Sequence, residues 1–155
     1  MDNRTKIIDE IHDRKAAGEI CVFTNGCFDI LHPGHVYLLK KASESGDFLV
    51  VGLNSDDSVK RLKGDSRPFN NVESRIEVLK AIRFVSYVLV FDEDTPLELI
   101  KLVRPDVLVK GGDYTPQTVV GCEFVESIGG RVEIIPLLEG YSTSSTLERM
   151  EKSES

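Results

Sequence analysis

Residues 24–35 read TNGCFDILHPGH, a turn-forming segment that contains two histidines. The apolar run before it, residues 20–23, has the β-branched and aromatic content of a buried strand. After it, residues 34–45 carry apolar side chains at helical spacing. The histidines are therefore expected where a strand passes into a helix, and the N–H groups and positive dipole end of a helix N-terminus favour anions.

The same alternation of strand and helix continues along the chain. Further apolar runs predict strands at residues 48–53, 85–91, 107–109 and 132–135. Helical patterns cover residues 1–19, 72–83, 95–104, 118–128 and 142–150, with a short helix ending near residue 62. Strands that are apolar on both faces and alternate with helices are typical of a parallel sheet covered on both sides.

We therefore predict one domain over residues 1–155, a doubly wound α/β fold with a five-stranded, Rossmann-like parallel sheet. In such folds ligands bind at the carboxyl ends of the strands. Residues 151–155 are expected to fray. Polar residues mark helix starts at the cluster Asn54-Ser55-Asp56-Asp57, at Asn71 and at Thr95, and Gly18 marks the end of the first helix.

Composition narrows the class of protein. With 41% hydrophobic and 29% charged residues, the chain resembles a soluble globular protein. No apolar run is long enough to span a membrane and the first residues lack the apolar core of a signal peptide, so we expect no membrane partner and a cytoplasmic location. The three cysteines form no CxxC pair, which favours reduced, structural thiols over a disulfide or a zinc site.

Charge is unevenly distributed. The net charge of −7 argues against non-specific binding of nucleic acid. Residues 60–83 nevertheless hold seven basic and three acidic residues, so this segment is +4 and the remainder −11. A solvated helix face explains Lys80 or Arg83, whereas the concentration of the others suggests a local anion site. Charge alone leaves both readings open.

Two common nucleotide-binding motifs are absent from the sequence: it has no G-x-x-x-x-G-K-[ST] loop and no G-x-G-x-x-G fingerprint after the first strand. His32-Pro33-Gly34-His35 offers another device, because imidazoles can donate to phosphate oxygens and glycine permits close approach of the backbone. An H-x-G-H pair taken alone could equally be a structural turn.

In its full context the segment resembles the G-x-F-D-x-x-H-x-G-H signature of cytidylyltransferase-like nucleotidyltransferases. Other segments, spread over residues 20–146, resemble the adenylyltransferase domain of bacterial ADP-heptose synthases, the heptose 1-phosphate adenylyltransferase family. These segments are N54-S-D, K60-R-L-K-G-D-S-R-P68, E73-S-R, E93-D-T-P, L108-V-K-G-G-D-Y114 and S142-T.

The resemblance implies transfer of AMP from ATP to a sugar 1-phosphate, most closely D-glycero-β-D-manno-heptose 1-phosphate, with release of pyrophosphate. It also implies Mg²⁺, bound mainly through the ATP phosphates, with no metal ligand assigned to a side chain. The attacking phosphate monoester has a second pKa of about 6 and is largely ionised at neutral pH, so it needs no general base. The reaction instead needs two anions held in line and the charge on the α-phosphoryl group neutralised.

Roles follow from that requirement and from the resemblance. The catalytic set is predicted to be His32, His35, Lys63 and Arg75, with the histidines binding phosphate and the cations neutralising the triphosphate. The nucleotide-binding set is predicted to be Thr24, Asn25, Gly26, Cys27, Phe28, Gly34, Lys110, Gly111, Asp113, Ser142 and Thr143. Lys60, Arg67 and Asp29 are assigned to the substrate. Asp29 could instead approach Mg²⁺ or organise the turn by accepting backbone N–H bonds, and the second of these is the role that we favour from sequence.

Alternatives remain open. Leu137-Leu138 stands where glycerol-3-phosphate cytidylyltransferases carry an Arg-Thr pair, which weakens that reading, while Tyr141 and Ser145-Thr146 also depart from the heptose family. The same chemistry with CTP and glycerol 3-phosphate, or with ATP and FMN, and a non-catalytic nucleotide-binding module are the other hypotheses. Because 155 residues cannot also contain a sugar kinase, we expect a separate heptose kinase, and the family suggests a dimer or larger assembly.

Overall fold

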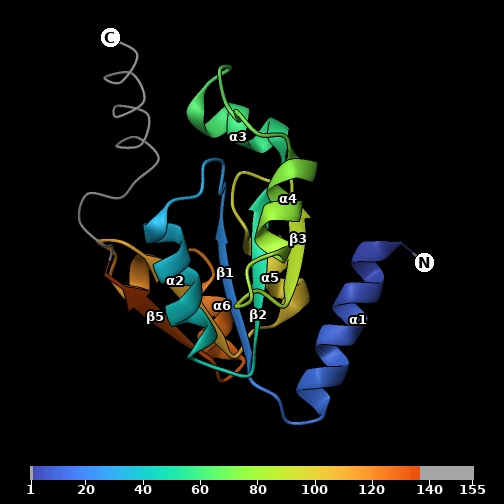
Figure 1. Cartoon of the computed structure of the whole chain (residues 1–155). Helices are drawn as coiled ribbons and strands as arrows, with labels where there is room; N and C mark the ends of the chain where they lie inside the picture. Colours follow the sequence, from blue (N-terminus) through green and yellow to red (C-terminus); the bar gives the residue numbers. More distant parts are fainter. Residues whose placement is uncertain (1, 137–155) are drawn as a thin grey trace.

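The computed structural model describes residues 2–136 of the chain. In that range five parallel strands form one sheet in the order β3-β2-β1-β4-β5 (Figure 1). The strands are β1 (Cys21–Gly26), β2 (Phe48–Asn54), β3 (Tyr87–Phe91), β4 (Val107–Gly111) and β5 (Arg131–Ile135). The chain winds outward from β1 through β2 and β3 and then returns to the other side of β1. The predicted doubly wound parallel sheet is confirmed.

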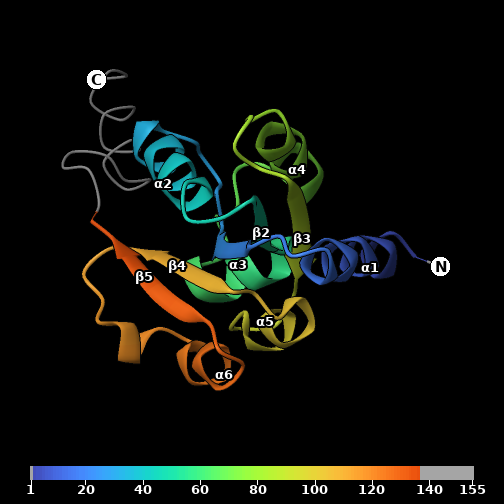
Figure 2. The ribbon, with the colours of Figure 1, turned by 90° about the horizontal axis from the view of Figure 1, so that it is seen from below.

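Helices cover both faces of this sheet (Figure 2). One face is packed by α2 (Pro33–Ser43) and α4 (Val72–Lys80), which bury Leu39 and Leu79. The other is packed by α1 (Asn3–Ala16), α5 (Leu97–Val103) and α6 (Cys122–Ser127). α3 (Asp56–Lys63) lies beyond the carboxyl ends of the strands (Figure 1). Two apolar cores therefore hold the central strands rigid between them.

The sheet opens at its centre. β1 pairs with β2 along its whole length, from Cys21 to Gly26. Its pairing with β4 covers only Val22 and Phe23, opposite Val107 and Leu108. The carboxyl halves of β1 and β4 therefore separate at the point where the strand order reverses, which is where ligands bind in folds of this kind.

Several predicted helix ends are confirmed. The Ser55 hydroxyl accepts from Ser58 N at 3.1 Å, and Asn71 Oδ1 accepts from Ser74 N at 2.9 Å. Gly18, at φ +95°, follows the last turn of α1, as expected of a C-terminal stop. Thr95 was wrong as an N-cap: Pro96 holds that position, and the Thr95 hydroxyl reaches only Leu97 N at 3.4 Å.

The helix predicted at residues 118–128 was also wrong in its first part. Residues Pro116–Thr118 form a single 3₁₀ turn, and α6 begins only at Cys122. Gly121 interrupts the pattern at φ +93°, where a Cβ would come within 2.8 Å of the Ile100 side chain. The close approach to α5 thus requires glycine and delays the helix. The helix predicted at residues 142–150 lies outside the described residues.

The N-terminal helix α1 packs beside α5 (Figure 2). His12 Nε2 lies 2.8 Å from the carbonyl oxygen of Leu102, and Ile11 is completely buried. His12 and Ile11 therefore both take part in fixing α1 to the rest of the domain. In residues 2–136, no helix has the length and apolar character needed to cross a membrane.

Candidate active site

His32 and His35 cap the first turn of α2 reciprocally. His32 Nδ1 accepts from Gly34 N at 3.1 Å, and His35 Nδ1 accepts from His32 N at 3.3 Å. The rings stack with centroids 3.8 Å apart and planes 24° apart. Because each Nδ1 is an acceptor, each neutral ring carries its proton on Nε2. The turn thus presents two N–H donors of fixed tautomer at a helix N-terminus, which suits an anion.

Burial lowers the pKa of His35 to about 4, and interactions with the neighbouring His32 and Lys63 act in the same direction. His35 is therefore neutral at pH 7. It can donate a hydrogen bond from Nε2 without carrying a charge, and it is too weakly basic to take a proton from a substrate at that pH. The arrangement agrees with the predicted phosphate-binding role of the ring.

Lys63 and Lys110 meet at a hollow of about 170 Å³ where β1 and β4 separate. The hollow is lined by Asn25, Gly26, Cys27, Phe28, His35, Leu38, Lys63, Lys110 and Gly111. A second hollow of about 130 Å³ shares Asn25 and Lys110 with the first and extends to Tyr114 and residues 118–120. The structure therefore brings most of the predicted nucleotide-binding residues together at the carboxyl edge of the sheet.

The electrostatics of this hollow favour anions. Burial lowers the pKa of Lys110, with the nearby Cys27 acting in the opposite direction. Its ammonium lies 5.5 Å from the centre of the Tyr114 ring. Burial raises the pKa of the Cys27 thiol, against the opposing influence of Lys63 and two arginines. The raised pKa disfavours the thiolate, which is the nucleophilic form, so Cys27 is better suited to line the site than to react.

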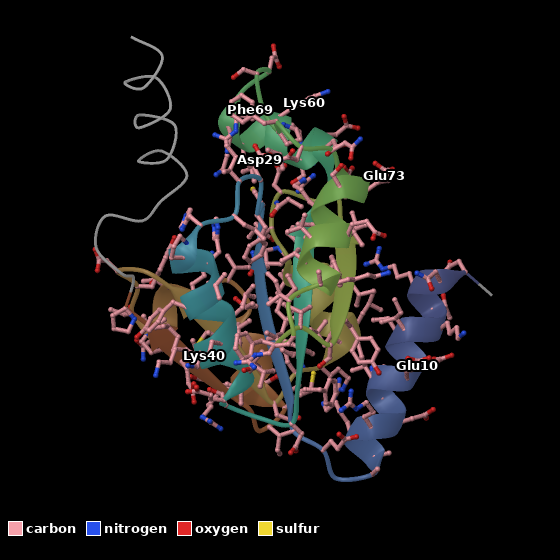
Figure 3. The ribbon with its side chains drawn as sticks, viewed as in Figure 1. Glu10, Asp29, Lys40, Lys60, Phe69 and Glu73 are labelled. Carbon is pink, nitrogen blue, oxygen red and sulfur yellow. The ribbon has the colours of Figure 1, made fainter. Side chains whose placement is uncertain are left out.

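The carboxylate of Asp29 binds other groups of the protein. It is buried and accepts from Phe69 N and Asn70 N at 2.9 Å each and from Arg67 Nε at 2.8 Å. Burial works against ionisation of Asp29, but these hydrogen bonds outweigh it and lower its pKa. Figure 3 shows Asp29 and Phe69 close together near α3. The expectation from sequence that Asp29 organises the turn agrees with this geometry, and its assignment to the substrate does not.

Arg75 is also internal. It is only 2% exposed, and its guanidinium donates to the carbonyl oxygens of Asn70, Cys27 and Asn54 at 2.8–3.0 Å and to Asp56 Oδ1 at 2.7 Å. These partners belong to four different segments. In this structure the side chain ties those segments together, in place of the predicted contact with the triphosphate. A solvated arginine and a buried one cannot be told apart from sequence spacing.

The remaining predicted residues fall outside the hollow or beneath it. Thr24 is completely buried, and its hydroxyl donates to Val109 O at 2.9 Å. Gly34 is buried in the first turn of α2. Lys60 and Asp113 are exposed and do not line the hollow; Figure 3 shows Lys60 on α3. Ser142 and Thr143 lie outside the described residues.

Sequence reasoning missed Asn70. Its N–H binds the Asp29 carboxylate, its amide donates to Asp29 O at 2.5 Å, and its carbonyl accepts from Arg75. The Asn-Asn pair before α4 was a signal for a turn, but only Asn71 was interpreted, as a cap. Asn70 completes a network that fixes the motif loop (residues 27–31) against α4.

Among residues 2–136, no group of three or more His, Cys, Asp or Glu side chains is placed to hold a metal ion. The polar side chains around the hollow are cations or neutral groups that can donate a hydrogen bond. They suit the oxygens of a phosphate better than a metal ion itself.

A larger hollow, of about 490 Å³, lies between α5 and α6, on the face of the sheet that α2 and α4 do not cover. Its lining includes Lys101, Gln117 and Cys122. It contains neither the histidine pair nor the splayed strand ends. We therefore assign the candidate site to the smaller hollows at the carboxyl edge.

Comparison with protein families decides the class. A family model described as cytidylyltransferase-like matches residues 23–150. The chain belongs to the cytidylyltransferase-like family. The match begins within β1 and includes the histidine turn and β4, so the predicted membership is confirmed and the candidate site lies within the matched region.

Relatives of known name support this membership. The chain is 56% identical over 147 residues to the "Bifunctional protein HldE" of Syntrophotalea carbinolica. This alignment covers 95% of this chain and 30% of that protein. The chain is 57% identical over 138 residues to the protein of the same name from Geobacter sulfurreducens, covering 89% and 28%. The chain thus spans less than a third of the length of these relatives.

Solved structures agree on the fold. The lipopolysaccharide core biosynthesis protein of Thermoplasma volcanium superposes with a TM-score of 0.63 at 29% identity, covering 81% of this chain and all of that one. A pantoate-β-alanine ligase from Francisella tularensis gives a TM-score of 0.61 at 16% identity, covering 92% and 70%. The second likeness concerns the fold alone.

Proposed function

We propose that this member of the cytidylyltransferase-like family transfers AMP from ATP to D-glycero-β-D-manno-heptose 1-phosphate, producing ADP-heptose and pyrophosphate. The observation that carries the proposal is the histidine turn, with both ring protons on Nε2, beside a hollow that also contains two lysines. The high identity to proteins named HldE favours the heptose phosphate as acceptor.

The reaction follows from the residues of the hollow. A phosphate oxygen of the sugar 1-phosphate attacks the α-phosphorus of ATP, and the bond from that phosphorus to the bridging oxygen breaks as pyrophosphate leaves. Nε2–H of His35, with that of His32, donates to the phosphoryl oxygens, where negative charge concentrates in the transition state. Lys63 and Lys110 reduce the repulsion between the two anions and hold them in line.

Two assignments from sequence change within this proposal. Arg75 and Asp29 position the site, since their polar atoms bind other parts of the chain. Mg²⁺ is proposed to enter with ATP, bound through phosphate oxygens, and to offset part of the charge of the triphosphate. Asp113, Lys60, Ser142 and Thr143 stay predictions as contacts to nucleotide or substrate.

The proposed substrates suggest which enzyme acts before this one and where in the cell it works. A sugar 1-phosphate must be supplied by a phosphorylating enzyme, and we propose that a heptose kinase does so. Because the donor is ATP, we propose a cytoplasmic location. We also propose a homo-oligomer, as the family suggests, and light scattering of the purified protein would test this oligomeric state.

A panel of nucleotides and acceptors tests the proposed reaction. The protein is incubated with ATP or CTP, Mg²⁺ and one of heptose 1-phosphate, glycerol 3-phosphate or FMN, and pyrophosphate release is measured. Release only with ATP and heptose 1-phosphate is expected. Release with another pair would reassign the acceptor, and binding of ATP without release from any pair would indicate a non-catalytic module.

His35→Ala separates catalysis from binding. We expect kcat to fall about a hundredfold or more, because one transition-state donor is lost, while the Kd for ATP changes less. Steady-state kinetics and calorimetric titration with ATP provide the two numbers. Equal losses in kcat and affinity would show that the ring only binds nucleotide.

A further inference from the structure

Phe28 has an unusual backbone conformation. Its φ is +46°, in the left-handed region that side chains other than glycine rarely adopt. Within residues 2–136, Arg104 is the only other residue besides glycine with positive φ. A bulky aromatic residue in this conformation is strained, and such strain persists only where the surroundings hold it in place.

The residues on both sides of Phe28 are fixed by hydrogen bonds. The carbonyl of Cys27 accepts from Arg75 Nη1 at 2.8 Å. The carboxylate of Asp29 is held by two backbone N–H groups and by Arg67. The chain therefore enters and leaves position 28 along defined directions, and the left-handed turn is imposed on Phe28 from outside.

This turn places the Phe28 ring in the interior. The side chain is 5% exposed and lies over Gly26, where a Cβ would come within 2.9 Å of Phe28 Cε2. It also lies beside His35, whose ring centroid is 5.2 Å away with the planes at 58°. His35 in turn stacks on His32. Gly26, Phe28, His35 and His32 thus form a series of contacts from β1 to the start of α2.

We propose that Phe28 is the positioning residue for His35: its strained backbone carries the ring against the imidazole and fixes the direction of Nε2–H toward the hollow. The Nδ1 hydrogen bond alone leaves the ring free to tilt about that contact, and packing on two sides removes this freedom. The contribution to AMP transfer rests on the proposed function, whereas the placement of the imidazole does not.

The test is Phe28→Leu, which keeps an apolar side chain and removes the ring. His35 is observed by NMR through its imidazole carbon-bound protons. In the variant the buried imidazole gains access to water, so its pKa is expected to rise from about 4 toward 6.5, and its signal to broaden. If the proposed reaction is confirmed, kcat should fall about tenfold while the KM for ATP stays within about threefold.

Phe48→Leu is the matched control, because Phe48 is equally buried but lies at the amino end of β2. It should leave the His35 titration and kcat as in the wild type. Phe28→Asn guards against failure to fold, since asparagine tolerates positive φ and removes the ring without adding backbone strain. It should reproduce the raised pKa.

The two proposals fail separately. An unchanged His35 titration in folded Phe28→Leu and Phe28→Asn would overturn the positioning role, whatever the enzyme does. A raised pKa together with no pyrophosphate release by the wild-type protein would support the positioning role and overturn the proposed reaction. A similar rise of the His35 pKa in Phe48→Leu would show that any loss of core packing exposes the imidazole, and it would also overturn the positioning role.

Discussion

At the scale of one residue, the buried guanidinium of Arg75 holds the loops around the candidate site in place and does not line the hollow itself. This guanidinium binds three carbonyls and one carboxylate, and only 1% of the Arg75 side chain is exposed. The partner carboxylate, on Asp56, is 34% exposed, so the pair is buried on one side only. Removal of Arg75 leaves buried carbonyl oxygens without donors, which costs more than the loss of an exposed ion pair.

We expect Arg75→Met to lower the free energy of unfolding by about 3 kcal/mol, because several buried acceptors lose their donor. Arg75→Lys should recover only a small part, since an ammonium cannot reach the same set of carbonyls. Urea unfolding followed by circular dichroism measures both. The control is Arg83→Met on the exposed end of the same region, expected within about 0.5 kcal/mol of the wild type. Equal effects at both positions would contradict the internal role.

The buried imidazole of His35 predicts a pH dependence of stability. Its pKa in the folded chain is about 4, below the value of 6.5 for an unperturbed side chain. Between these values the unfolded chain binds the extra proton, so the free energy of unfolding should fall as pH decreases from about 6.5 to about 4. Above pH 6.5 this contribution is constant.

Urea titrations at pH 7 and pH 4.5 measure this loss, and His35→Gln supplies the comparison. Glutamine keeps a side-chain acceptor but does not titrate, so the difference between the two pH values should shrink in the variant. Asp29, whose pKa is lowered, adds its own loss only in more acidic solution. An identical pH dependence in wild type and variant would show that His35 does not take up the proton.

At the scale of elements, the stability of α4 depends on its first turn. The side chain of Asn71 caps the helix by accepting from Ser74 N. Arg75 is the residue after Ser74, so the cap also helps to fix the direction in which the Arg75 side chain points. We expect Asn71→Ala to cost about 1 kcal/mol of stability, because one N–H of the first turn loses its acceptor. Asn71→Asp keeps the acceptor and should cost little. Thermal unfolding of the two variants provides the measurement, and equal losses would exclude the cap as the cause.

Elements with local signals were predictable from sequence, and the polar network was not. Strands buried on both faces appear as apolar runs. The polar cluster at residues 54–57, which contains the N-cap Ser55, and Asn71 indicate the starts of their helices by residue type. The delayed start of α6 depends on the approach of Gly121 to Ile100, which no local pattern contains. Likewise, Arg67 and Arg75 resemble phosphate ligands in sequence, because the carboxylates and carbonyls that hold them come from distant segments.

At the scale of the whole molecule, the sheet consists of two halves joined at β1 and β4. Their main-chain pairing stops after Phe23, and the strands then separate to form the candidate site. Thr24 is the next residue, and its hydroxyl donates to Val109 O across the widening gap. This side-chain bond extends the connection between the halves by one residue and sets the floor of the site.

Thr24→Val tests this connection, because valine has nearly the same shape but cannot donate. We expect it to lower the free energy of unfolding by about 1–2 kcal/mol, since the Val109 carbonyl loses a buried donor, whereas Thr24→Ser retains the hydroxyl and should lose less. Hydrogen exchange should accelerate at the amides of β4 in Thr24→Val, where the opening is localised, and remain unchanged in β3 on the far edge of the sheet. If valine costs no more than serine and exchange in β4 is unaltered, the halves are held together by packing of the two cores alone.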